Sequence, residues 1–414
     1  MNQHALGVLE FHRVLEKVAG RATSELGRQR VLELRPGVRL GLVQGELQRV
    51  EETARFLDRH RDWVIPLVPD ALEALERLRL EGSVLEPKEL FSIGQLLTSG
   101  RELKDGLASA SSELPSLQLL REGLFPDREA EKAIGRIVDR DGTILDTASQ
   151  ELKRIRQRLR RIHGKVVQTL EKLMGSLPDR LVVPDASVTI RDGRYVIPVR
   201  REGKNEVGGV VLDESATGAT LFMEPPVALE LMAELRGLQR EETREILRIL
   251  REQTEAARPS LQLLEGSPEA LGALDSLLAR ARAALAWDGS APTLLTSGTP
   301  EVTIVHGRHP LLLARADGEV VPFDLELDPG ERALVVSGPN TGGKSVFLKA
   351  VGLVATLAQS GVIPPVGPGT RIPLFSKVFA DIGDEQSIVE SLSTFSAHLG
   401  NLREIVAEAD EGSL

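Results

Sequence analysis

The stretch GPNTGGKS at residues 338–345 decides the fold of the last part of this chain, because it matches the pattern GxxxxGK[ST]. The apolar run at 333–336 predicts a short buried strand before it, and the pattern at 346–359 predicts a helix after it. In such a loop the glycines let backbone N–H groups face bound phosphates, and the helix N-terminus adds its dipole. The sequence therefore predicts a nucleotide-binding loop between a strand and a helix.

The residues of this loop have distinct expected roles. Lys344 should reach the β- and γ-phosphates of ATP, and the Ser345 hydroxyl should take one position on Mg²⁺. These two are the candidate catalytic residues, and Ser345 is the candidate metal ligand. The candidate cofactor-binding residues are Gly338, Pro339, Asn340, Thr341, Gly342, Gly343, Lys344, Ser345 and Val346.

A cluster of hydroxyl residues, SLSTFS at 391–396, lies just before a second predicted helix. Such a cluster at a helix start is usually an N-cap. Beside a phosphate loop it is also a candidate second anion site, directed at a γ-phosphate. The residues alone leave both interpretations open.

The middle of the chain predicts two long helices that form an antiparallel arm. In the first, at 144–174, apolar positions recur alternately three and four residues apart, which is the seam of a coiled coil. These positions are Leu152, Ile155, Leu159, Ile162, Val166, Thr169 and Leu173. The second long helix is predicted at 226–257.

Residues between the two helices predict a small antiparallel sheet at the tip of the arm. The β-rich runs 187–191 and 194–197 flank Asp192–Gly193, a strong hairpin signal. A second pair of runs, 208–212 and 220–223, flanks another polar turn. A sheet of this size needs the helices to support it.

Charge is unevenly distributed along the chain. With 51 Lys and Arg against 61 Asp and Glu, the net charge is −10, yet residues 151–204 carry fourteen basic and six acidic side chains. A basic segment in an acidic protein is compatible with nucleic-acid contact confined to that segment, and equally with a solvated helix face. The candidate nucleic-acid contacts are Arg154, Arg156, Arg158, Arg160, Arg161, Lys165, Arg191, Arg194, Arg200, Arg201 and Lys204.

Composition excludes several classes of protein. The absence of cysteine rules out disulfides, thiolate metal sites and cysteine nucleophiles. No apolar run approaches the roughly 20 residues of a membrane span, and the N-terminus lacks the apolar stretch of a signal peptide. We therefore expect a cytoplasmic protein without a membrane partner.

The sequence of residues 1–143 predicts helices, and the composition of residues 289–300 predicts a linker.

Several stretches together resemble MutS-family ATPases. They are GPNTGGKS at 338–345, GRHPLL at 307–312 and DIGDEQSIVESLSTFSAHL at 381–399. The stretches at 5–30, 191–200 and 213–225 resemble the second bacterial subgroup, which carries a C-terminal Smr module and lacks the mismatch-reading domain. In one departure, Phe323 stands where relatives commonly have asparagine, near the expected adenine pocket.

The resemblance implies a multidomain α plus α/β fold. It comprises a helical core domain at 1–143, lever helices at 144–290 with a β clamp near 181–225, and an incomplete ABC-type P-loop ATPase domain at 291–414. The ATPase domains of a homodimer would pair head to tail. Ser393, Thr394 and Ser396 would then contact the partner's γ-phosphate in trans.

The resemblance also implies an ATP-dependent clamp on nucleic acid. The subgroup is associated with suppression of homologous recombination at branched DNA and with splitting of collided ribosomes, whose ribosomal RNA would then be the partner. Its endonuclease activity belongs to the Smr module. The alternative is a P-loop phosphotransferase with a helical appendage, which leaves the arm unexplained. A purely mechanical coiled-coil linker would need arms longer than the ~45 Å that ~30 residues span.

Only 77 residues run from Gly338 to Leu414. A P-loop ATPase completes its site with a later strand ending in an acidic residue that holds Mg²⁺. We therefore expect a C-terminally truncated chain that binds nucleotide weakly and does not hydrolyse it at a useful rate.

Overall fold

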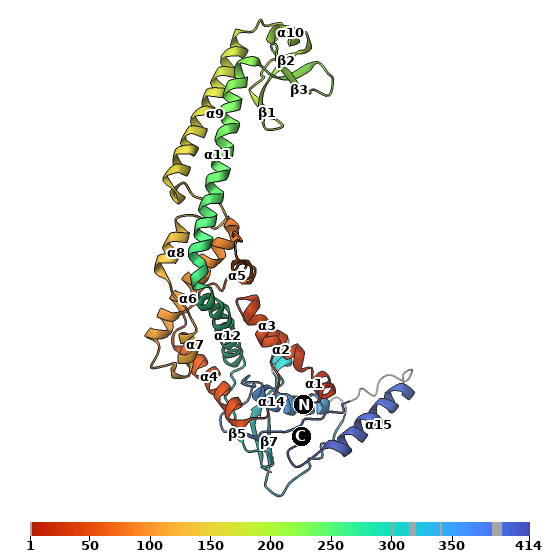
Figure 1. Cartoon of the computed structure of the whole chain (residues 1–414). Helices are drawn as coiled ribbons and strands as arrows, with labels where there is room; N and C mark the ends of the chain where they lie inside the picture. The colour runs from red at the N-terminus through yellow and green to blue at the C-terminus, as the bar shows by residue number, and fades with distance from the viewer. Residues whose placement is uncertain (1, 300, 314–319, 340–341, 383–390) are drawn as a thin grey trace. The chain divides into compact units, whose positions relative to one another are not determined.

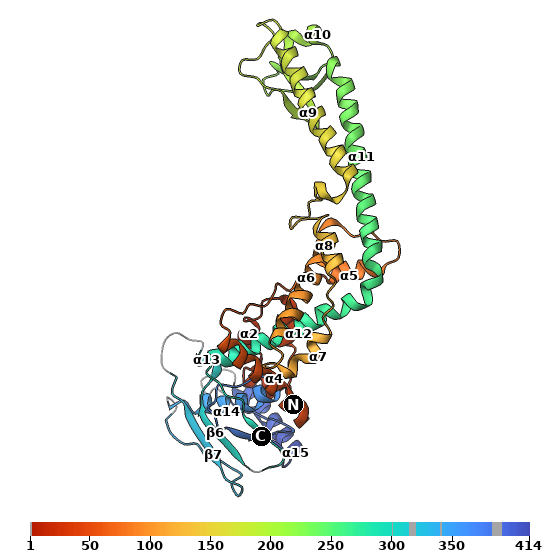
Figure 2. The ribbon, with the colours of Figure 1, turned by 90° about the vertical axis from the view of Figure 1, so that its left-hand side faces the viewer.

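The computed structural model describes residues 2–299, 301–313, 320–339, 342–382 and 391–414, the last range without the side chains of 391–398. The chain forms two compact units (Figures 1 and 2). Unit 1 comprises Met1–Leu72, Gln95–Arg128 and Gln262–Leu414, and unit 2 comprises Glu73–Gly94 and Glu129–Leu261. Both are mainly helical and each contains one small sheet. This agrees with the α plus α/β class expected from the sequence.

Helices from both ends of the sequence share the core of unit 1. Leu9 and Phe11 belong to one buried cluster with Leu353 and Leu357. A side chain at Gly352 would place its Cβ 2.6 Å from the end of the Leu9 side chain, so glycine lets the two helices approach without displacing Leu9. The helices of this unit are α1 (Gln3–Val8), α2 (Phe11–Ala19), α3 (Glu25–Leu32), α4 (Leu40–Arg59), α7 (Gln118–Glu122), α13 (Pro310–Leu313), α14 (Lys344–Gln359) and α15 (Ser391–Glu408).

The sheet of unit 1 has the order β5-β8-β6-β7, with β5 (Thr293–Leu295) parallel to β8 (Arg371–Pro373). Strand β6 (Val302–Gly307) runs antiparallel to β8 and to β7 (Phe323–Leu327). The linker predicted at 289–300 is therefore wrong in part. Its residues 293–295 form a strand because β8, distant in sequence, supplies their hydrogen-bond partners.

The buried strand predicted at 333–336 is also wrong. These residues belong to no strand of the described structure, and Val335 is 89% exposed. A strand needs a neighbour to pair its backbone N–H and C=O groups. None of the described strands pairs with 333–336, so their apolar and β-branched composition is not enough to form one.

Unit 2 is built around two long helices, α9 (Gln150–Ser176) and α11 (Pro226–Ala257). Figures 1 and 2 show them side by side, running in opposite directions, with a sheet at one end of the pair. The prediction for 226–257 is confirmed. The first helix begins later than predicted because Ser149 is its N-cap, accepting a hydrogen bond from Leu152 N at 2.9 Å. The other helices here are α5 (Leu72–Arg79), α8 (Arg128–Gly135) and α10 (Lys204–Val207), while α6 (Pro87–Ser109) and α12 (Leu261–Ala286) extend across the boundary between the units.

The apolar seam of α9 follows the prediction as far as Val166, and the next buried position is Leu170 in place of Thr169. A helix has 3.6 residues per turn, so a strict alternation of three and four drifts off the buried face. The seam packs against α11 through Ala228, Met232, Leu235 and Leu238. Burying one such large apolar side chain contributes about 1.5–3 kcal/mol, which is what holds the two helices together.

The tip sheet has the order β1-β2-β4-β3 and is antiparallel throughout. Its strands are β1 (Thr189–Arg191), β2 (Arg194–Arg200), β3 (Val210–Glu214) and β4 (Thr220–Glu224). Both predicted hairpins are confirmed. Asp192 and Gly193 have φ values of 47° and 69°, as a two-residue turn with two left-handed positions requires. Ile197, Val199 and Met223 share one apolar cluster with α9 and α11, which supports the sheet.

Candidate functional site

The loop at 338–345 borders a cavity of about 740 Å³ in unit 1. From the loop, Gly338, Pro339, Gly342, Gly343 and Lys344 line it, and Val346 and Phe347 follow from α14. The apolar stretch 320–323 also lines it. Asn340 and Thr341 lie outside the described residues. A cavity of this size with a mostly apolar lining is typical of small-molecule sites.

The backbone at the start of α14 has the geometry of an anion site. Gly343 is the N-cap with φ 79°, a left-handed conformation that favours glycine. The first N–H groups of α14, which begins at Lys344, have no partner within the helix. The Lys344 side chain donates to the carbonyl oxygen of Gly338 across the loop. The Lys344 cation and the N-terminus of α14 therefore both face this cavity.

Ser345 lines a neighbouring cavity of about 480 Å³, which shares His309, Leu312 and Val346 with the first. One turn along α14, Lys349 Nζ donates to Glu10 Oε2 at 3.1 Å. This hydrogen bond is the main cause of a lowered pKa of the Glu10 carboxyl, against the effect of burial. The candidate Mg²⁺ ligand thus lines the same cavity as the ion pair between Glu10, the N-cap of α2, and Lys349 of α14.

Phe347 was not among the predicted cofactor ligands, and Phe323 was named only for its place near the expected adenine pocket. Their rings meet edge to face, with centroids 4.9 Å apart, and both line the larger cavity. Phe347 could have been suggested by its place two residues after Ser345 on the predicted helix. The contribution of Val320–Phe323 depends on the pairing of β7 with β6, which the local sequence does not reveal.

The hydroxyl cluster lies within α15, which begins at Ser391, and not before a helix as predicted. The side chains of Ser393, Thr394 and Ser396 lie outside the described residues. Their role as trans ligands stays a prediction.

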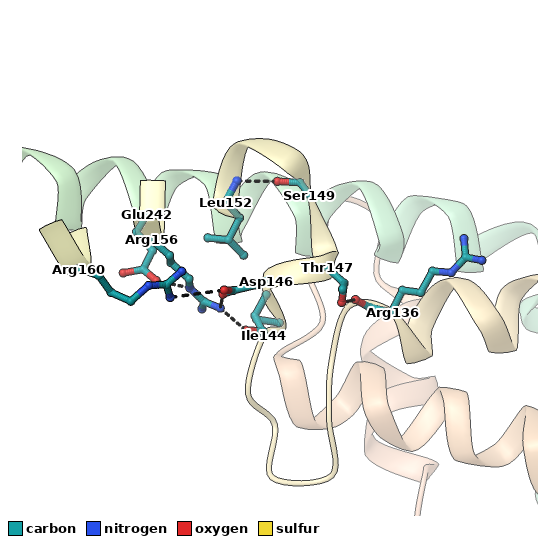
Figure 3. A network of polar contacts seen from close by, with 9 residues as sticks. All are labelled: Arg136, Ile144, Asp146, Thr147, Ser149, Leu152, Arg156, Arg160 and Glu242. Carbon is teal, nitrogen blue, oxygen red and sulfur yellow. Dashed lines mark hydrogen bonds and ion pairs between the residues drawn. The ribbon is translucent and has the colours of Figure 1, made fainter. Parts of the chain in front are cut away.

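In the arm, Arg156 is engaged within unit 2 (Figure 3). Its Nη1 donates to Asp146 Oδ1 at 2.8 Å and to the Ile144 carbonyl oxygen at 2.7 Å, and its Nε donates to Glu242 Oε1 at 2.7 Å. The side chain is only 20% exposed. The Arg156 hydrogen bond is the main cause of a lowered pKa of the Asp146 carboxyl. Arg156 therefore joins α9 to α11 and to the segment before α9.

The other candidate cations of α9 are exposed. Arg154 pairs with Glu151, Arg158 with Glu241 and Arg160 with Asp146, at distances of 3.5–3.7 Å. Such solvent-exposed pairs contribute little to stability. Arg161 and Lys165 have no ion pair with any residue that the structure describes.

The candidate cations of the tip sheet are mostly paired with acids. Arg191 lies 3.2 Å from Asp213, Arg194 lies 3.1 Å from the buried Glu224, and Arg201 pairs with Glu214 at 2.5 Å. Arg200 donates to the Val182 carbonyl oxygen, and Lys204 has no ion pair within the described ranges. Some of the eleven predicted nucleic-acid contacts are thus held by acids or carbonyl groups of the protein itself, and the others are available to a ligand.

Among the described residues, none of the helices combines the length and apolar character that a membrane crossing requires.

Comparison with known proteins adds two findings. Residues 334–414 match the family model of MutS domain V. The whole chain aligns with proteins named endonuclease MutS2 at 45% identity in Gemmatimonas aurantiaca, 41% in Pelotomaculum thermopropionicum and 37% in Bacillus velezensis. In each case the alignment covers 100% of this chain and 51–52% of the relative, so the chain spans about half the length of the curated relatives it matches. The resemblance found in the motifs is confirmed.

Proposed function

Because the chain is a MutS2-like protein along its whole length, we propose that it acts as an ATP-dependent nucleic-acid-binding clamp of the MutS type. The observation that carries the proposal is the glycine-rich loop at the N-terminus of α14, which lies within the MutS domain V match and faces a cavity of about 740 Å³. The proposed division is a helical core at 1–143, lever helices with a β clamp at 144–290, and part of an ATPase domain at 291–414.

The nucleotide would be held by Gly338–Val346, with α14 N–H groups and Lys344 on its phosphates. Mg²⁺, held in part by Ser345, would supply charge compensation to those phosphates. The protein's own residues position the nucleotide through the fixed backbone at Gly343 and the cation of Lys344. We assign the apolar wall at 320–323 to the base or ribose side of the nucleotide.

The remaining parts of the proposal concern partners. In a homodimer, Ser393, Thr394 and Ser396 would reach the partner's nucleotide in trans. The basic arm would contact branched DNA or the ribosomal RNA of stalled ribosomes, in a cytoplasmic setting. The endonuclease activity in the relatives' names is assigned to a Smr module and not to the residues described here.

The proposal is tested by binding of a fluorescent ATP analogue in the presence of Mg²⁺. Lys344→Ala should weaken binding at least tenfold, since the variant loses the only loop side chain that is cationic. Lys153→Ala, which removes an exposed lysine of α9, is the matched control and should bind like the unaltered chain. If both variants bound the analogue equally well, Lys344 and its loop would not hold the nucleotide, contrary to the proposal.

The phosphotransferase alternative predicts a different response. Its nucleotide turnover would rise with a small-molecule acceptor and be indifferent to nucleic acid. No feature of the described structure favours it over the clamp.

A further inference from the structure

We propose that the arm binds the phosphodiester backbone of nucleic acid along the exposed side of α9, and not through the tip sheet. The binding surface, called here the α9 row, consists of Arg154, Arg158, Arg161, Lys165 and Lys172. The inference rests on the nucleic-acid binding proposed above and narrows it to one face of one helix. Lys172 is a residue that the sequence patterns did not select.

The α9 row is continuous along the helix. Its members follow one another at intervals of four, three, four and seven residues, and the exposed Gln168 fills the longest interval. This spacing keeps them on one face, away from the buried seam of Leu152 to Leu170. From Arg154 to Lys172 the helix rises about 27 Å, which matches about eight steps of 3.4 Å along one strand of duplex DNA.

The charges of the α9 row are available to a ligand. Arg161, Lys165 and Lys172 form no side-chain ion pair or hydrogen bond with any described residue, and all three are exposed. Arg154 and Arg158 form only long exposed pairs, at 3.7 and 3.5 Å. A phosphate can displace such a pair at small cost, because exposed ion pairs are worth less than about 1 kcal/mol.

The charge balance of unit 2 points to the same surface. Helix α9 carries eight basic and two acidic side chains, whereas residues 177–225 of the tip carry six basic and eight acidic ones. Helix α11 carries five basic and seven acidic side chains. Helix α9 therefore accounts for six of the eight excess positive charges in residues 151–204, and the tip as a whole is net acidic.

The tip arginines are also committed to structural contacts. Arg191 lies over the ring of Phe222 at 4.7 Å besides pairing with Asp213. Arg194 neutralises Glu224, whose side chain is 1% exposed. Breaking that pair would leave a buried carboxylate without its cation, which is costly. A phosphate that binds these tip arginines therefore gains less free energy than one that binds the α9 row.

The composition of α9 indicates what is recognised. It contains no Phe, Tyr or Trp, so it lacks the large aromatic rings on which proteins that bind single strands stack bases. Flexible cations in a row contact phosphates and carry no sequence information. We infer binding that is independent of sequence and steeply dependent on salt, with each lost phosphate contact reducing the salt slope by about 0.9.

The test is fluorescence anisotropy of the full chain with a labelled four-way DNA junction and, separately, a labelled duplex RNA, over a range of salt. The triple variant Arg161→Gln, Lys165→Gln, Lys172→Gln should lose at least tenfold in affinity at low salt and about two to three units of salt slope. Because these side chains have no described intramolecular partner, its thermal unfolding should be unchanged.

Two matched variants complete the experiment. Arg236→Gln, Arg240→Gln, Arg251→Gln removes three exposed charges from α11, and Arg191→Gln, Arg201→Gln alters the tip; both should change affinity less than twofold. If either of these variants lost as much affinity as the α9 triple variant, the assignment to α9 would be overturned. It would also be overturned if the α9 triple variant lost affinity for only one of the two nucleic acids. Unaltered binding by the α9 triple variant would overturn this inference but leave the clamp proposal standing. Absence of binding by the unaltered chain would contradict both.

Discussion

Two parts of this protein are proposed to bind phosphate groups, and they are built in opposite ways. At the loop before α14, backbone N–H groups and one lysine converge on a single cavity, and neighbours in sequence are neighbours in space. Along α9, separate side chains present charge over about 27 Å, and their availability depends on which acids lie nearby. The first site should therefore fail after one substitution, and the second only after several.

The largest effect is expected from the loop backbone. Gly343→Val places a β-branched residue at φ 79°, where L-residues other than glycine are strained by about 1–2 kcal/mol. The loop should shift to relieve this strain, and affinity for a fluorescent ATP analogue should fall at least tenfold. Nucleic-acid affinity measured without nucleotide should not change.

The control is Gly82→Val, at φ 76° in a turn with nothing within 4 Å of the added Cβ. It should carry similar strain without altering nucleotide binding. If Gly343→Val binds the analogue normally, the loop does not depend on its backbone, and the contrast with α9 disappears.

A smaller effect, on stability and not on binding, is expected at Arg156. Arg156→Ala leaves Asp146 and Glu242 without their shared cation, and hydrogen bonds to charged groups are worth about 1.5–3 kcal/mol each before solvent screening. The segment before α9 should open more often, seen as faster amide hydrogen exchange over residues 144–156.

Arg154→Ala, which removes only an exposed pair with Glu151, should leave that exchange nearly unchanged. If Arg156→Ala lost much of its salt-dependent affinity for nucleic acid while its hydrogen exchange stayed unchanged, Arg156 would contact nucleic acid and would not serve mainly to stabilise the arm.

The smallest effect concerns pH. A hydrogen bond from Arg248, assisted by one from Ser149 at 2.6 Å, lowers the pKa of Glu245 from 4.5 to about 2. Because the folded pKa lies below the unfolded one, the carboxylate adds stability that is present above about pH 4.5 and is lost as the pH falls towards 2. Arg248 is half exposed, so the contribution is on the order of 1 kcal/mol.

Glu245→Gln should therefore flatten the pH dependence of thermal unfolding between pH 4.5 and 2. Glu241→Gln on the same helix, whose pair with Arg158 is exposed and 3.5 Å long, is the control and should keep the original dependence. A steeper dependence in Glu245→Gln would contradict the assignment.

Much of the arm could be predicted from the sequence, for physical reasons that are local. Helix α11 has the predicted bounds, and Asp192–Gly193 forms the predicted turn, because both depend on residues a few positions apart. The departure at Thr169 came from applying a strict coiled-coil repeat to a helix with 3.6 residues per turn. Four of the five residues of the α9 row were among the candidates from the sequence, but the sequence could not separate them from Arg156, because the acids that engage Arg156 lie ten residues before it and on another helix.

The sequence by itself determined the two long helices and the hairpins, since the hydrogen bonds that define them join residues close in the chain. Only the tertiary structure decided that residues 293–295 form a strand while 333–336 do not, and that the N-terminal helices share a core with α14. It also decided which arginines remain available to a ligand. Strand pairing, burial and charge neutralisation are all set by partners distant in sequence, and no local pattern specifies them.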